Sequence, residues 1–304
     1  MLHWRLISAA VILSVLVTLV WLDSRQAIGY GVWLLPMLLA VSLLATEEVL
    51  SMLRAKNYQP VAWPIYLGNL LIPLAASGPL LFALAGQQFP EANPLGRGGW
   101  PMAVLAIGAI AVIGAEMGRY RQPGTAIVHA ALGIFTLVYV GLLFSFVALL
   151  RLHKSNEWGL LALISVLAIT KMADTGAYFF GRAFGRHKMT PILSPGKTWE
   201  GAAGGILAAC AASWACFHWF GPWLVQSQYV EPPVIASLLY GLILAAAGMH
   251  GDLAESLLKR DMQRKDSSTW LPGLGGVLDI VDSVLVAAPC AYLCWVLGLV
   301  GPGG

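Results

Sequence analysis

Long apolar segments separated by short polar ones make up most of this chain of 304 residues. Nine such segments can be recognised, at residues 6–22, 30–46, 63–86, 100–115, 125–150, 159–180, 201–220, 233–249 and 277–300. Since a helix needs roughly 20 apolar residues to cross the hydrocarbon layer, the pattern predicts an all-α, polytopic membrane protein with about nine transmembrane helices. Several prolines within residues 63–86 predict a kink in the third helix.

The composition supports a membrane protein. Hydrophobic residues make up 58% of the chain and charged residues 11%, and the mean hydropathy is +0.75. A soluble domain carries roughly 25% charged residues, so this chain is expected to be solvated mostly by lipid, and nucleic acid is not expected as a partner. The short alternating strands of a membrane barrel are not found. The first segment has no small-x-small cleavage site after it and predicts a retained anchor.

The basic residues predict the orientation of the chain. With a cytoplasmic N-terminus, four basic residues fall outside, namely Arg25, Arg97, Arg151 and Lys154. Thirteen fall inside, namely Arg5, Arg54, Lys56, Arg119, Arg121, Arg182, Arg186, Lys188, Lys197, Lys259, Arg260, Arg264 and Lys265. Because cytoplasmic loops carry the excess of Lys and Arg, this asymmetry favours a cytoplasmic N-terminus, and nine spans then place the C-terminus outside.

Acidic residues gather in the stretch 248–283, between two apolar segments. It holds six of the fifteen acidic residues of the chain: Asp252, Glu255, Asp261, Asp266, Asp279 and Asp282. Two groups have helical spacing, because Asp252, Glu255 and Ser256 stand at i, i+3 and i+4, and so do Asp279, Asp282 and Ser283. Each group therefore projects from one face of its helix. Carboxylates at membrane edges are costly and usually mark function.

Polar residues also appear between 171 and 201. Lys171 and Asp174 lie three apart inside an apolar segment, where a local ion pair is the simpler structural interpretation. The following loop is basic and rich in hydroxyl groups and glycine, which suits a polyphosphate. Gly196, Lys197 and Thr198 resemble the end of a P-loop, but the glycine required five residues earlier is Pro191, so that interpretation fails.

Basic loops and helix-borne carboxylates on one membrane face are the combination that phosphoryl transfer requires. Mg²⁺ takes a few carboxylates together with phosphate oxygens of the substrate, while Lys and Arg neutralise the charge that develops on the transferred group. Binding of anionic lipid headgroups explains the basic loops but not the acidic groups. The four cysteines all lie in apolar segments and predict buried hydrophobic residues rather than a metal site or disulfides.

These motifs resemble the signature of the phosphatidate cytidylyltransferase, or CDP-diacylglycerol synthase, family. The upstream match consists of Asp174, Gly176, Ala177, Tyr178, Phe179, Ser194, Pro195, Lys197, Thr198, Trp199, Glu200 and Gly201. The C-terminal match consists of Gly251, Asp252, Glu255, Ser256, Lys259, Arg260, Lys265, Asp266, Ser267, Leu271, Pro272, Gly273, Gly275, Gly276, Leu278, Asp279, Asp282 and Ser283. The chain has Leu274 and Ile280 where the family commonly has His and Arg.

The resemblance implies transfer of the cytidylyl group from CTP to phosphatidate in the cell (inner) membrane, with membrane lipid as surroundings. It implies Mg²⁺, with or without a second monovalent cation, on Asp252, Asp279 and Asp282. It implies catalytic roles for Asp252, Asp279, Asp282, Lys259 and Arg260, with phosphates also held by Lys197 and Lys265. The wider substrate-binding set is Asp174, Ser194, Lys197, Thr198, Glu255, Ser256, Lys265 and Asp266.

We predict a transmembrane scaffold over 1–150 and a catalytic region over 151–304, with cytoplasmic loops at 181–199 and 252–276. Three alternatives stay open besides the choice between monomer and homodimer. A transporter would show two halves of matching pattern, which are not seen. A CDP-alcohol phosphotransferase would have Gly-x-x-Ala-Arg after Asp282, where this chain has Ser-Val-Leu-Val. The third alternative is a non-catalytic relative of the resembled family, because Leu274 and Ile280 depart from the family pattern.

Overall fold

The computed structural model describes residues 2–25, 29–90, 93–271, 273 and 275–302. In this part of the chain, eight helices are long and apolar enough to cross a membrane, and a bent pair makes a ninth candidate. The prediction of an all-α polytopic fold is confirmed. The two short strands that the structure describes form a hairpin, β1 (Lys188–Thr190) and β2 (Ser194–Thr198).

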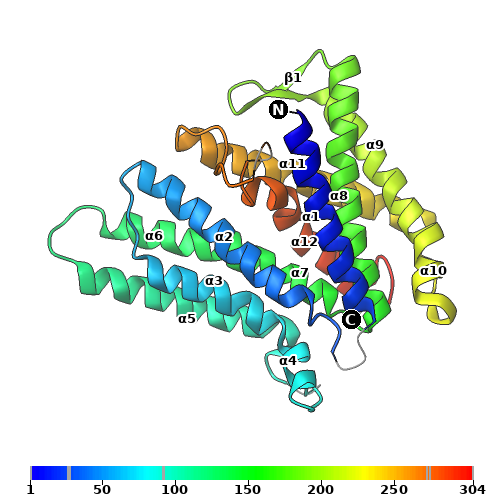
Figure 1. The fold of residues 1–304 in the computed structure, drawn as a ribbon, viewed down its shortest axis with the longest axis horizontal. Coiled ribbons are helices and arrows are strands. Elements are labelled where there is room, and N and C mark those ends of the chain that lie inside the picture. Colours follow the sequence, from blue (N-terminus) through cyan, green and yellow to red (C-terminus); the bar gives the residue numbers. More distant parts are fainter. Residues whose placement is uncertain (1, 26–28, 91–92, 272, 274, 303–304) are drawn as a thin grey trace. The chain divides into compact units, whose positions relative to one another are not determined.

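Figure 1 shows the helices in chain order. The first seven are α1 (Leu2–Ser24), α2 (Leu34–Ala55), α3 (Ala62–Ala76), α4 (Gly78–Leu84), α5 (Gly96–Arg119), α6 (Ala126–Thr136) and α7 (Leu143–Arg151). The remaining five are α8 (Asn156–Phe184), α9 (Trp199–Ala215), α10 (Gly221–Val225), α11 (Val234–Asp261) and α12 (Leu278–Val296). π-helical turns at Leu137–Leu142 and Cys216–Phe220 join α6 to α7 and α9 to α10, so each pair forms one candidate span.

The kink predicted in the third apolar segment is the break between α3 and α4, where the axis bends by 71°. Pro73 lies inside α3 and Pro79 in the first turn of α4. Neither proline can donate a backbone hydrogen bond, which weakens the helix at this point. The hydroxyl of Ser77 donates to the Pro73 carbonyl at 3.0 Å and satisfies one acceptor at the break.

The chain forms two compact units, and the division passes through α12. Unit 1 comprises Met1–Leu152 and Asp261–Ile280, and unit 2 comprises His153–Arg260 and Val281–Gly304. The predicted regions 1–150 and 151–304 are functional assignments and stay predictions. The predicted loop 252–276 begins later than expected, since α11 runs to Asp261. Glu255 and Lys259 form an i, i+4 ion pair in its last turns, and Lys259 and Arg260 suit the C-terminal end of a helix.

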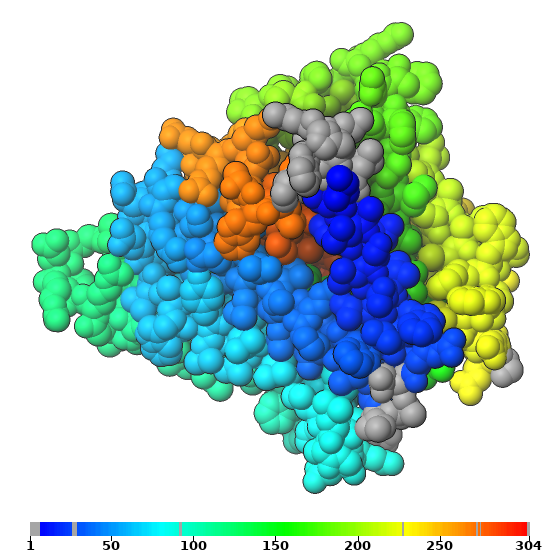
Figure 2. All heavy atoms as spheres, viewed as in Figure 1, coloured from blue at the N-terminus to red at the C-terminus, as the bar shows by residue number. Residues whose placement is uncertain are grey.

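Small and polar residues hold unit 1 together. The amide of Asn69 on α3 donates to the Thr46 hydroxyl on α2 at 2.7 Å, and Ser42 donates to the Asn69 carbonyl at 2.8 Å. α3 lies beside α5, as seen in Figure 1. The described part of α1 exposes six large apolar side chains, namely Ile7, Val11, Leu13, Val15, Val17 and Trp21. Figure 2 shows this helix uncovered along the visible face. An apolar face of this kind suits contact with lipid.

In unit 2, glycines let α8 and α9 pack at close range. A Cβ at Gly176 or Gly205 would lie within 3 Å of backbone carbonyl oxygens of the neighbouring helix. Small residues at helix contacts are the usual solution in membranes, where close packing replaces the hydrophobic effect. The buried Tyr240 of α11 links Ser165 of α8, at 3.0 Å, to the indole of Trp295 on α12, at 3.1 Å. This packing fixes the helices that carry the acidic residues of unit 2.

The orientation of the spans remains a prediction. We expect single cysteines at Gly196 and Gln263 to be labelled only from the cytoplasmic side, and one at Pro302 only from outside, because of the thirteen-to-four distribution of basic residues. The surroundings of Gly196 are open, so a side chain there is accessible. The measurement is labelling of cells and inverted vesicles by an impermeant maleimide, with the native cysteines replaced by alanine. Labelling of Gln263→Cys from outside would overturn the assignment.

Candidate active site

Three carboxylates converge in unit 2. Asp252 and Glu255 lie on α11 and Asp282 on α12, and one ligand oxygen from each lies within 4.8 Å of the others. The helices approach closely because α11 has a glycine at the contact. A Cβ at Gly251 would overlap the carbonyl oxygen of Asp282 and lie 3.2 Å from the Cα of Ser283. Gly251 therefore lets the two acidic groups meet.

Two lysines partly neutralise this cluster. Lys197 Nζ lies 2.8 Å from Asp252 Oδ2 and 3.5 Å from the Met249 carbonyl oxygen. Lys259 Nζ lies 2.7 Å from Glu255 Oε2, and the Glu255 side chain is only 1% exposed. These three acids and two lysines carry one excess negative charge, which favours a cation. Asp252, 37% exposed, gives the cluster access to solvent.

Lys171 and Asp174 of α8 belong to the same electrostatic environment. Their side chains form the predicted i, i+3 ion pair at 3.5 Å, yet remain 48% and 40% exposed. Asp174 also interacts electrostatically with Asp252 and Lys197, and Asp282 with Lys171 and Asp174. The charges of this pair therefore add to the electrostatic field at the acidic cluster. Lys171 was not in the predicted site, although its charge within an apolar segment was a visible signal.

The β1–β2 hairpin brings its residues to the end of α11. Glu200 accepts hydrogen bonds from the backbone N–H groups of Arg186 and His187, and its Oε1 lies 2.6 Å from His187 Nδ1. Thr198 caps the N-terminus of α9 by accepting from the Gly201 N–H at 3.1 Å. Arg260 Nε donates to the Leu193 carbonyl in the turn at 3.3 Å. The hairpin is thus held by Glu200 of α9 and by Arg260 of α11.

Thr198 and Ser194, two predicted substrate ligands, lie in β2. The Thr198 side chain is buried and its hydroxyl serves the helix cap, while Ser194 is half-buried in β2. Ser256 lies beside the acidic cluster, with its hydroxyl 3.5 Å from Asp252 Oδ1. In unit 2 the structure therefore gathers Asp252, Glu255, Ser256, Lys259, Asp282 and Lys197 around one point.

Asp279 lies in the part of α12 that belongs to unit 1. Its Oδ2 accepts from Ser267 N at 3.1 Å, Ser267 Oγ at 2.7 Å and Gly276 N at 2.7 Å. Gly275 has φ +93°, and a Cβ there would lie 2.5 Å from the same oxygen. The paired glycines of the motif are therefore required by backbone conformation and by close approach to a carboxylate.

The other predicted site residues of this segment, Lys265 and Asp266, are exposed in the loop before Ser267. Leu274, one of the two departures from the family pattern, lies outside the described residues. Glu48 of α2 contacts the segment from within unit 1. The sequence did not predict this contact, because Glu48 is only one of a pair of acids at the end of an apolar segment.

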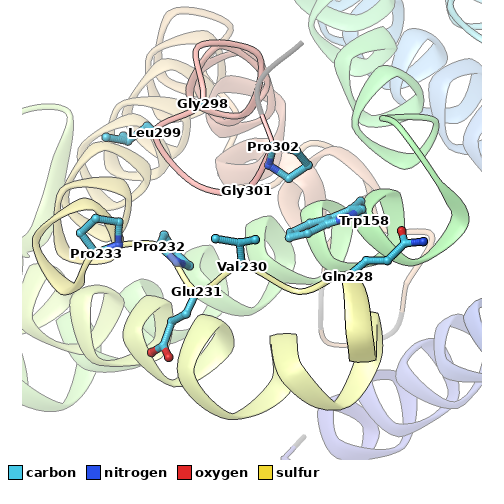
Figure 3. A pocket seen from close by; sticks show the side chains of 10 residues that line it. All are labelled: Trp158, Gln228, Val230, Glu231, Pro232, Pro233, Gly298, Leu299, Gly301 and Pro302. Carbon is cyan, nitrogen blue, oxygen red and sulfur yellow. The ribbon is translucent and has the colours of Figure 1, made fainter.

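A separate hollow of about 430 Å³ lies at the other end of the unit 2 helices (Figure 3). Its lining includes Trp158, Val230, Pro232 and Leu299. Trp158 precedes Asp174 by sixteen residues on α8, which corresponds to roughly 24 Å along a helix. The hollow is therefore not part of the acidic cluster, and none of the predicted site residues lines it.

The residues of the cluster fit a magnesium ion by their chemistry. Mg²⁺ prefers oxygen ligands, is usually held by one or two carboxylates, and completes its shell with water and substrate phosphates. Asp252, Glu255 and Asp282 offer only hard oxygen donors at short separations, and the solvent-accessible Asp252 leaves room for further ligands. No thiol or imidazole belongs to this group in the described residues.

Comparison with known proteins gives consistent matches. The family model described as the cytidylyltransferase family matches residues 3–297. The phosphatidate cytidylyltransferase of Haemophilus influenzae is 42% identical over 131 residues, which are 43% of this chain and 44% of that protein. That of Brucella suis is 40% identical over 157 residues, 52% of this chain and 54% of that protein. The phosphatidate cytidylyltransferase of Bacillus subtilis is 31% identical over 260 residues, which are 85% of this chain and 88% of that protein. The chain thus matches about half the length of the first two.

Proposed function

The chain belongs to the cytidylyltransferase family, and we propose that it transfers the cytidylyl group of CTP to phosphatidate, giving CDP-diacylglycerol and pyrophosphate. The observation that carries the proposal is the convergence of Asp252, Glu255 and Asp282 with Lys197 and Lys259 in a polytopic membrane chain. A carboxylate cluster with adjacent lysines suits a reaction in which every reacting group is a phosphate.

In the proposed reaction, a phosphate oxygen of phosphatidate attacks the α-phosphorus of CTP. The bond from that phosphorus to the oxygen bridging to the β-phosphate breaks, and the electron pair leaves with pyrophosphate. Because the attacking oxygen is already anionic, no Ser or Cys nucleophile is needed. Phosphoryl transfer then depends mainly on positioning and charge neutralisation.

We propose that Asp252 and Asp282 hold Mg²⁺, with a monovalent cation as an optional second ion. The sequence motif assigns Asp279 to the metal as well. The bound ion supplies positive charge for the phosphate oxygens. Lys197 and Lys259 exchange their present carboxylate partners for phosphate oxygens, and Arg260 and Lys265 hold the outer phosphates. The proposed substrate-binding set also includes Asp174, Glu255, Ser256 and Asp266.

The site is proposed to lie at the cytoplasmic boundary of the cell membrane, where CTP arrives from water and phosphatidate from the leaflet. Support comes from the position of the acidic residues at the ends of candidate spans. Basic residues near the same helix ends favour that side for an anionic nucleotide. Asp252 and Glu255 lie on α11 and Asp282 on α12, two helices labelled in Figure 1.

The proposal predicts that purified protein in detergent converts labelled CTP and phosphatidate into labelled CDP-diacylglycerol with release of pyrophosphate. A chelator should remove the activity and Mg²⁺ should restore it. We further expect Leu274→His to change kcat by less than about tenfold, because general acid–base assistance, typically worth about 10²–10⁴-fold, matters little for a good leaving group. Ile280→Arg should also change kcat by less than about tenfold, because neighbouring basic residues already neutralise the phosphate charge.

Diacylglycerol, which lacks the attacking phosphate, is the matched control acceptor and should give no product. Two results contradict the proposal in different ways. If no product forms with any acceptor or metal, this chain does not have the proposed activity. An inactive wild type together with an active Leu274→His, Ile280→Arg double variant identifies the chain as a non-catalytic relative.

A further inference from the structure

A fully buried carboxylate in unit 1 has no part in the proposed chemistry. Glu48 lies on α2 and its side chain is 0% exposed. Its chain neighbour Glu47 is 31% exposed and pairs with Arg54 at 2.9 Å. Keeping a charge out of water is costly unless hydrogen bonds compensate for the lost hydration. The partners of Glu48 therefore indicate why it is buried.

Glu48 accepts four hydrogen bonds, all from the segment that precedes and begins α12. Oε1 accepts from Ser268 Oγ and Val277 N, each at 2.8 Å. Oε2 accepts from Ser267 Oγ and Leu278 N, each at 2.8 Å. Leu278 is the first residue of α12, so the carboxylate also caps the positive end of that helix. One side chain thus fixes both ends of residues 267–278.

The same segment holds Asp279. The Ser267 hydroxyl lies 2.8 Å from Glu48 Oε2 and 2.7 Å from Asp279 Oδ2, so it stands between the two carboxylates and donates its single proton to one of them at a time. Ser267 N and Gly276 N donate to the same oxygen of Asp279. The groups that orient Asp279 are therefore themselves placed by Glu48.

The fit around Glu48 leaves no space for a larger residue at Gly276. A Cβ there would overlap Ser267 Oγ and both carboxylate oxygens of Glu48. Such overlap requires the backbone of the segment to move, because the neighbouring groups are buried and hydrogen-bonded. The glycine thus permits the contact between the segment and the carboxylate of α2.

We propose that Glu48 is a positioning residue for the reaction, which fixes the orientation of the Asp279 carboxylate through Ser267 and the backbone of residues 276–278. This inference rests on the proposed function, in which Asp279 serves the metal. A carboxylate is required because it offers two oxygens and no donor. An amide would present an N–H₂ group to a backbone N–H on one side, and that N–H would lose its acceptor.

The first experiment compares Glu48→Gln with Glu47→Gln, which removes the neighbouring charge on the same helix. We expect kcat of Glu48→Gln to fall about 10–100-fold, as for outer-shell partners of metal ligands, with the KM for CTP unchanged. The Mg²⁺ concentration for half-maximal activity should rise. Glu47→Gln should retain wild-type kcat and the wild-type Mg²⁺ requirement.

The second measurement does not depend on activity. Hydrogen–deuterium exchange of peptides covering 266–280 should become roughly tenfold faster in Glu48→Gln, because a backbone hydrogen bond is lost there, while other helices keep their protection. A double-mutant cycle combines Glu48→Gln with Ser267→Ala. Because both residues act on Asp279, kcat of the double variant should fall by less than the product of the two single decreases.

The outcomes separate the inference from the function on which it rests. If wild-type protein forms no CDP-diacylglycerol, the proposed function fails, and the exchange data alone decide whether Glu48 places the segment. Unchanged exchange at 266–280 in Glu48→Gln overturns the positioning role, as does wild-type kcat in an active enzyme. Faster exchange throughout the protein would show that Glu48 only stabilises the fold.

Discussion

Asp252→Asn is expected to lower the rate of CDP-diacylglycerol formation by more than about 100-fold, since loss of a residue that merely supports a metal ligand already costs about 10–100-fold. The protein should stay folded, because Asp252 is 37% exposed and its partner Lys197 is 19% exposed. Asp282→Asn should have the same effect on rate. The measurement is initial rate against Mg²⁺ concentration, with thermal unfolding in detergent followed in parallel.

Asp261→Asn is the matched control, because Asp261 is exposed at the last residue of α11 and outside the cluster. It should leave the rate within about twofold, as expected for a surface charge. Wild-type activity in Asp252→Asn would show that Asp252 is not a metal ligand of the active site. Loss of folding in place of loss of rate would identify the carboxylates as structural ion-pair partners, whose breakage costs about 3–5 kcal/mol when they are buried.

Arg151→Met is expected to reduce the free energy of unfolding of unit 1 by about 3–5 kcal/mol, because it leaves a buried charge without its partner. Arg151 and Asp23 are 3% and 0% exposed, and Arg151 Nη2 lies 2.6 Å from Asp23 Oδ2. Asp23 also accepts from the backbone N–H groups of Gly31 and Trp33, so the pair secures the connection between α1 and α2. Unfolding by SDS, followed by circular dichroism, measures the loss.

Arg25→Met provides the comparison, because Arg25 is an exposed arginine close in sequence to Asp23 and lies over the Trp21 ring at 5.2 Å. It should change stability by less than about 1 kcal/mol. A double variant with Asp23→Asn and Arg151→Met should recover much of the loss, since it removes the unpaired buried charge while the amide oxygen still accepts from the backbone N–H groups. Equal stability of Arg151→Met and wild type would show that the pair contributes nothing.

The sequence by itself determined the candidate spans and the places along the chain where acidic residues group. Hydropathy is a local property, so the apolar segments predicted the helices, and the prolines of residues 63–86 predicted the bend of 71° between α3 and α4. Helical periodicity is local too, so Asp252, Glu255 and Ser256 could be placed on one face of a helix. The family also followed from motifs within short segments.

The tertiary structure decided which carboxylates meet and what holds them. Asp252 and Glu255 join Asp282 because Gly251 allows α11 and α12 to approach, a contact that no local pattern encodes. Thr198 resembled a phosphate ligand in the sequence, while its hydroxyl caps α9. Glu48 looked like scaffold because its partners Ser267 and Leu278 lie 219 and 230 residues away in the chain. A residue's hydrogen-bond partners depend on packing across the whole fold, whereas hydropathy and periodicity depend only on its neighbours in sequence.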